Sequence, residues 1–173
     1  MEFFDVIHSR YSHKSRFLDT AVPYEHLCKI AQAGLAAPTG SNLQCVHLII
    51  LEDKAAIAPL LDISARDRLE SVPAAIALFT TSANQGDPNF EMEDYGAAAE
   101  NILLAAVAMG YASCWLDSPY FGESEQRAAC EALGVPEGYH LRVLLPIGLP
   151  EDEGSRRAKK PFCERVSRGV YGR

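Results

Sequence analysis

The chain has 173 residues, of which 48% are hydrophobic and 23% charged, and its formal net charge is −7. These values are typical of a globular protein that buries one core, so we expect residues 1–173 to form a single domain. The acidic balance argues against a binder of nucleic acid or of anionic membranes, and no apolar stretch approaches the roughly 20 residues of a membrane span.

Cysteine and histidine spacing indicates neither a disulfide framework nor a metal site. The cysteines are Cys28, Cys45, Cys114, Cys130 and Cys163. They are odd in number and include no CxxC pair, which is typical of reduced thiols in a cytoplasmic protein. The N-terminus, Met1-Glu2-Phe3-Phe4-Asp5, lacks the basic start and the apolar core of a secretory signal peptide. The histidines show no HxxxH or HExxH spacing, so we expect no metal.

Helical and strand patterns alternate along the chain. A first helix is expected to end near Arg10, and a second begins at Pro23 with an apolar stripe from Leu27 to Leu35. The later elements are a strand over 46–51, helical pieces over 54–68, a strand over 74–79, a helix over 94–109, a short strand over 112–116, a helix over 124–133 and a strand over 140–148. This order lacks a regular βαβ cadence and predicts an α+β fold with helices around a mixed sheet.

The helix expected over 94–109 is apolar on nearly every face and ends at Gly110, a favourable C-terminal cap. Its many alanines allow close approach, either to a sheet or to a second copy of the same helix. The polar residues 82–89 before it are predicted to form a connector.

Small hydrogen-bonding residues separate the second helix from the first strand, in the run Ala36-Ala37-Pro38-Thr39-Gly40-Ser41-Asn42-Leu43-Gln44. A loop of this composition on the edge of a core strand can grip a flat ligand with a polar rim. The alternative is an ordinary connection between a helix and a strand.

Two basic clusters lie at opposite ends of the acidic chain. Arg10, Ser12 and Lys14 alternate, so an extended segment would point all three to one side, where they could hold an anion such as phosphate. The second cluster is Arg156-Arg157-Ala158-Lys159-Lys160. The two could form one anion site or could be separate solvated patches. Neither GxGxxG nor GxxxxGK[ST] occurs, so a Gly-rich phosphate loop is unsupported.

No pair of a nucleophile and a base is evident. Cys114 stands among apolar residues, which favours a structural role. If the protein is an enzyme, a cofactor supplies the reactive group, and we name no residue as catalytic.

Four segments resemble, in order, the motifs of the nitroreductase family of flavin-dependent oxidoreductases. They are Arg10-Tyr11-Ser12-His13-Lys14, the loop Ala37 to Gln44, the stretch Gly96 to Trp115, and Ile147-Gly148-Leu149-Pro150 followed by Arg157-Ala158-Lys159-Lys160-Pro161. The resemblance spans nearly the whole chain.

The resemblance implies a single FMN-binding domain with the nitroreductase fold, assembled as an intertwined homodimer with active sites at the interface. Arg10, Lys159 and Arg157 would hold the FMN phosphate, and Ser12 and Lys14 would reach the ribityl chain and the pyrimidine edge. Pro38, Thr39, Gly40 and Asn42 would line the flavin from the other subunit. The implied reaction is ping-pong hydride transfer from NAD(P)H through FMN to nitro, quinone or related electron-poor small molecules.

The chain departs from the family at three places. Cys45-Val46 stands where Pro-Trp is common, and residues 116–120 contain no glycine. The region from Thr81 to Asp94 is also short for a helical lid over the substrate. These departures keep three alternatives open: other flavin chemistry such as dehalogenation or flavin breakdown, a non-catalytic FMN store or sensor, and a flavin-free structural dimer.

Overall fold

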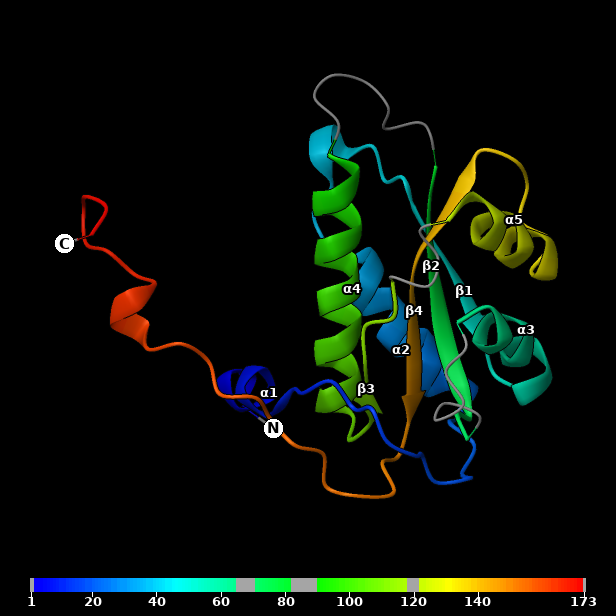
Figure 1. Ribbon diagram of the computed structural model, residues 1–173, viewed down its shortest axis with the longest axis horizontal. Coiled ribbons are helices and arrows are strands. Elements are labelled where there is room, and N and C mark those ends of the chain that lie inside the picture. The colour runs from blue at the N-terminus through cyan, green and yellow to red at the C-terminus, as the bar shows by residue number, and fades with distance from the viewer. Residues whose placement is uncertain (1, 65–70, 82–89, 118–121, 173) are drawn as a thin grey trace.

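The computed structural model describes residues 2–64, 71–81, 90–117 and 122–172. The α-helices are α1 (Phe3–Ser9), α2 (Tyr24–Leu35), α3 (Lys54–Ser64), α4 (Glu91–Ala108) and α5 (Glu123–Ala132). The strands are β1 (Val46–Leu51), β2 (Ala74–Thr81), β3 (Ala112–Ser113) and β4 (Tyr139–Gly148). Two 3-10 helices, η1 (Gly40–Asn42) and η5 (Phe162–Glu164), complete the order (Figure 1).

The strands form one sheet in the order β1-β2-β4-β3. Each of these neighbouring strand pairs is antiparallel, with Leu78 opposite Leu48 on one side and Val143 on the other. A parallel bridge joins Ser12 to Ser113 at the β3 edge. The α+β class is confirmed, the pairings among the four described strands are antiparallel, and the parallel pairing is confined to this isolated bridge.

Helices cover both faces of the sheet, α2 and α4 on one and α3 and α5 on the other (Figure 1). Strand β2 is buried on both sides, because Ala75, Ala77 and Phe79 pack toward one layer and the alternate residues toward the other. This two-sided burial explains why the 74–79 segment is a continuous apolar run. Among the described residues, no helix is long and apolar enough to cross a bilayer.

Helix α4 begins one turn earlier than the sequence predicts, at Glu91 rather than near Asp94. The Arg142 side chain fixes this first turn, because its Nε donates to Glu91 Oε1 (2.7 Å) and to Thr80 Oγ1 (2.9 Å). The predicted end is confirmed: the helix stops at Ala108, and Gly110 has a φ of +86°.

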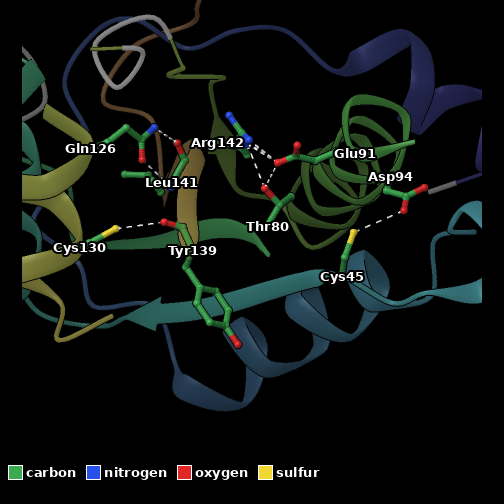
Figure 2. Close-up of polar contacts among 9 residues, drawn as sticks. All are labelled: Cys45, Thr80, Glu91, Asp94, Gln126, Cys130, Tyr139, Leu141 and Arg142. Atoms are coloured by element: carbon green, nitrogen blue, oxygen red, sulfur yellow. Dashed lines mark hydrogen bonds and ion pairs between the residues drawn. The ribbon is translucent and has the colours of Figure 1, made fainter. Parts of the chain in front are cut away.

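The expected strand over 112–116 is shorter than predicted. Only Ala112–Ser113 forms β3, and Leu116 makes an isolated bridge to Leu144. Further along this edge of β4, the Gln126 side chain from α5 takes the place of a strand. It donates to the Leu141 carbonyl (2.6 Å) and accepts from the Leu141 N–H (2.8 Å), as Figure 2 shows. The C-terminal end of the helical prediction over 54–68 and the connector over 82–89 lie outside the described residues.

Candidate functional site

The two chain ends run side by side after the last strand. The Leu18 N–H donates to the Leu149 carbonyl (2.9 Å), and the Glu151 N–H donates to the Arg16 carbonyl (3.0 Å). Ser15 Oγ then donates to Asp152 Oδ2 (2.7 Å). This antiparallel contact carries the C-terminal basic cluster to the basic segment that precedes Ser15.

A cavity of about 550 Å³ lies between these two segments. Its lining comprises Arg10, Tyr11, Ser12, His13, Lys14 and Ser15 from the N-terminal side, and Asp152, Glu153, Gly154, Ser155, Arg156, Arg157 and Lys159 from the C-terminal side. The lining therefore includes five basic side chains of Arg and Lys and two acidic ones. The structure brings together Arg10, Ser12, Lys14, Arg157 and Lys159, which sequence patterns had placed in two clusters more than 140 residues apart. We call this the anion pocket.

The segment 11–14 has the extended form that the alternation predicts. Ser12 and Lys14 are exposed, and His13 between them is completely buried. The His13 backbone N–H donates to the Ser113 carbonyl (3.0 Å), and its ring Nε2 lies 3.0 Å from the Arg16 carbonyl, which requires the proton on Nε2. The ring also packs edge-on against Phe17 at 4.7 Å between centroids. Fixing His13 inside the protein directs both of its neighbours outward.

Arg10 is held from helix α4. Its Nε lies 3.5 Å from Glu100 Oε1, and its side chain is 23% exposed. This ion pair restrains the Arg10 guanidinium beside the pocket, where such a group can bind an oxyanion through paired N–H donors. Sequence patterns did not single out Glu100.

Gly154 shapes the other wall of the anion pocket. A Cβ atom at this position would lie 1.9 Å from Tyr11 Cε2, so the backbone of the tail passes directly against the Tyr11 ring. Sequence reasoning missed Gly154 because its requirement comes from a residue at the other end of the chain.

The loop 38–44 lies elsewhere in the same chain. Thr39 and Asn42 line a second cavity of about 400 Å³ together with Ala37, Gln44 and Ala98. Neither Pro38 nor Gly40 lines it, and none of the four predicted loop residues lines the anion pocket. Figure 1 shows η1 beside the start of α4 and α1 beside the other end of that helix. Within one chain, the predicted site residues thus form two separate groups.

The loop has an unusual backbone. Ser41, Asn42 and Gln44 have φ angles of +50°, +56° and +52°, a region that residues with side chains rarely adopt. Two polar contacts hold this shape: the Gln44 N–H donates to Thr39 Oγ1 (3.2 Å), and the Gly40 N–H donates to Asp94 Oδ1 (2.8 Å). Asp94 is only 2% exposed and was missed by sequence reasoning.

Aromatic side chains lie on the same face as α4. Burial raises the pKa of Tyr95, whose ring lies 6.1 Å from the ring of Trp115, and burial also raises the pKa of Tyr111. Cys114 is buried in the core, as a structural cysteine should be. The described residues contain no group of three His, Cys, Asp or Glu side chains that could hold a metal ion.

Comparison with known proteins identifies the class of protein to which this α+β fold belongs. The model of the nitroreductase family matches residues 7–82 and 64–149, so the chain belongs to the nitroreductase family. A protein of Archaeoglobus fulgidus, provisionally named an NADH dehydrogenase/NAD(P)H nitroreductase, is 31% identical over 79% of each chain.

Solved structures show the same fold. A Parabacteroides distasonis protein, provisionally named an NADH dehydrogenase/NAD(P)H nitroreductase, has a TM-score of 0.84 at 22% identity over 98% of both chains. An FMN-dependent nitroreductase of Clostridium difficile has a TM-score of 0.83 at 24% identity, over 97% of this chain and 99% of that one. The protein is an oxidoreductase of this family.

Proposed function

We propose that the protein binds FMN and transfers hydride from NAD(P)H to small electron-poor acceptors such as nitro compounds and quinones. The observation that carries the proposal is the anion pocket, where basic residues from both chain ends surround one cavity. The names of two similar proteins, an NAD(P)H nitroreductase and an FMN-dependent nitroreductase, support FMN as the cofactor and NAD(P)H as the donor.

The donor set of the anion pocket fits the FMN phosphate. Arg10 and Arg157 offer guanidinium groups that bind phosphate oxygens in pairs, and Lys159 adds a point charge. The five basic side chains outweigh Asp152 and Glu153 by three charges, so a dianionic phosphate is favoured over a neutral ligand.

When bound, FMN would supply the hydride chemistry, which explains why the described residues need no nucleophile or general base. The chain would hold and orient the cofactor. Arg10, Arg157 and Lys159 would fix the phosphate, and Ser12 would bind the ribityl chain. Lys14 would place a positive charge at the pyrimidine edge, where it favours electron density on the ring system.

We further propose a homodimer in which each site combines the anion pocket of one chain with the loop 38–44 of the other. Two observations support this arrangement. The loop and the anion pocket are separate within one chain. Residues 155–172 are all exposed, and this tail includes Phe162 at 78% and Tyr171 at 102% exposure. Apolar side chains of this size are normally covered, and a second copy would cover them. In Figure 1 the tail extends away from the body of the protein.

In the part of the chain that the structure describes, none of the five cysteines forms a disulfide, which suits a reducing compartment, so the proposal places the enzyme in the cytoplasm.

An anaerobic titration tests the proposal. The FMN-loaded protein is titrated with NADH and, separately, with NADPH while the yellow flavin absorbance is followed. We expect stoichiometric bleaching by at least one nicotinamide, and recovery of the absorbance when a quinone or nitroarene is added. Initial rates at several acceptor concentrations should give the parallel double-reciprocal lines of a ping-pong reaction.

Other outcomes would favour the alternatives. Bound FMN that NAD(P)H leaves oxidised would indicate a storage or sensing protein. Bleaching without turnover of any nitro or quinone acceptor would indicate other flavin chemistry. A protein that takes up no FMN would contradict the proposal.

A further inference from the structure

Asp94, in the first turn of α4, contacts two points that flank most of the loop 38–44, namely Gly40 and Cys45, the residue after the loop. Its Oδ1 accepts the Gly40 N–H at 2.8 Å, and its Oδ2 lies 3.5 Å from the Cys45 thiol (Figure 2). The carboxylate is 2% exposed and Cys45 is also 2% exposed. Burying a carboxylate costs free energy unless hydrogen bonds compensate for the lost hydration. Here the Gly40 N–H and the Cys45 thiol provide such contacts.

Phe90 closes on the same glycine. A Cβ atom at position 40 would lie 2.2 Å from Phe90 Cδ2, so no larger residue fits between the loop and this ring. The N-terminal end of α4 therefore confines Gly40 through two residues, one by a hydrogen bond and one by close packing.

The loop needs such a restraint because of its backbone. Three residues other than glycine, Ser41, Asn42 and Gln44, have positive φ angles between the two contact points of Asp94. Strained conformations of this kind persist only where the surrounding structure holds them, and they concentrate at ligand-binding segments.

The restraint has a firm base. Arg142 on β4 joins Glu91 of the first turn of α4 to Thr80 of β2, and Thr80 is completely buried. Figure 2 shows Glu91 of this cluster and Asp94 on the same helix, α4. The N-terminal turn of α4 thus connects the loop to the sheet: Asp94 binds the loop, and Glu91 is bound to Arg142 of β4.

We propose that Asp94 is a positioning residue, whose buried carboxylate holds the loop in the shape in which Thr39 and Asn42 contact the flavin ring. This inference rests on the proposed function, because that function places the loop against FMN. Cys45 supplies the second contact in this chain. A proline, which is common there in the family, has neither a thiol nor a backbone N–H to donate.

The test compares dissociation constants for FMN and for riboflavin, which lacks the phosphate, in the wild-type protein and in Asp94→Ala, Asp94→Asn and Glu93→Gln. Quenching of flavin fluorescence gives both constants. Glu93→Gln is the matched control, because it removes one exposed negative charge from the adjacent residue. We expect Asp94→Ala to weaken both flavins at least tenfold and by the same factor, since the loop contacts the ring and not the phosphate.

Asp94→Asn should recover part of the affinity, because its amide oxygen can still accept the Gly40 N–H, and Glu93→Gln should bind like the wild type. Gly40→Ala disturbs the same contact from the loop side and should weaken both flavins in the same way. If Asp94→Ala does not fold, Asp94→Asn and Gly40→Ala decide the question.

Wild-type affinities and an unchanged visible circular dichroism of the bound flavin in these variants would overturn the inference, even if their thermal stability falls. Loss of FMN affinity alone, with riboflavin binding intact, would also overturn it. A wild-type protein that binds neither flavin would instead overturn the proposed function, and the inference with it.

Discussion

The anion pocket and the loop 38–44 are built in opposite ways. The pocket consists of charged side chains at the surface, set on two extended segments, with Lys14, Arg157 and Lys159 exposed. The loop is held by a buried carboxylate, by close packing on Phe90 and by its own threonine. A phosphate can be recognised by flexible cations because its charge dominates the interaction. A flat ring offers little charge, so its contacts depend on backbone that is fixed before the ligand arrives.

This difference predicts how each half fails. The anion pocket should lose affinity when charge is removed and keep the fold. The loop should lose affinity when its buried supports are changed without any loss of charge near the phosphate.

The largest effect is expected from removing the tail. A truncation after Gly154 removes Arg156, Arg157 and Lys159 from the anion pocket, and all of the deleted residues that the structure describes are exposed. At about 1.5–3 kcal/mol per charged contact, FMN affinity should fall roughly 100-fold or more, with a retained far-ultraviolet circular dichroism spectrum. Isothermal calorimetry measures the loss.

A shorter truncation, after Lys160, serves as its control. It keeps the basic cluster and removes the exposed apolar residues from Phe162 onward, so it should preserve the preference for FMN over riboflavin. Sedimentation equilibrium should show whether it also loses the dimer. Equal FMN affinity in the longer truncation and the wild type would show that the tail takes no part in the pocket.

A smaller effect is expected from Gly154→Ala. The added Cβ would overlap the Tyr11 ring, so one wall of the anion pocket must move, and FMN affinity should fall about tenfold. Gly96→Ala in α4 is the matched control, because the added Cβ meets no atom within 4 Å. This variant should leave the free energy of unfolding unchanged or raise it by up to about 1 kcal/mol. Similar flavin titrations for both variants would contradict the described wall.

The smallest effect is expected on stability at alkaline pH, through the partly buried Tyr95 of α4. Burial raises the pKa of Tyr95 above the value of 10.0 of a free tyrosine, so the folded protein holds this proton more tightly than the unfolded chain does. The resulting stability is complete below pH 10 and is lost as the pH rises through the folded pKa. Tyr95→Phe should therefore flatten the decline of the urea midpoint above pH 10. Tyr171→Phe, at a fully exposed position, should not change it.

Sequence patterns predicted the fold class, most of the helices and strands, and the two basic clusters that the structure brings together around one cavity. Apolar periodicity is local, and the alternation of Arg10, Ser12 and Lys14 needs no partner to be recognised. Asp94, Glu100 and Gly154 escaped because their roles arise from contacts with Gly40, Arg10 and Tyr11, each distant in the chain. The early start of α4 was missed for the same reason, since Arg142, which is distant in the chain on β4, holds Glu91 in the first turn of the helix.

The central claim is that the two chain ends form one phosphate site. It is tested most directly by FMN and riboflavin dissociation constants for Arg10→Ala/Lys159→Ala beside a control, Lys29→Ala/Arg127→Ala, which removes two exposed cations outside the pocket. We predict that the first variant loses FMN affinity at least 100-fold and binds FMN no better than riboflavin, while the control matches the wild type. An unchanged preference for FMN in Arg10→Ala/Lys159→Ala would contradict the account.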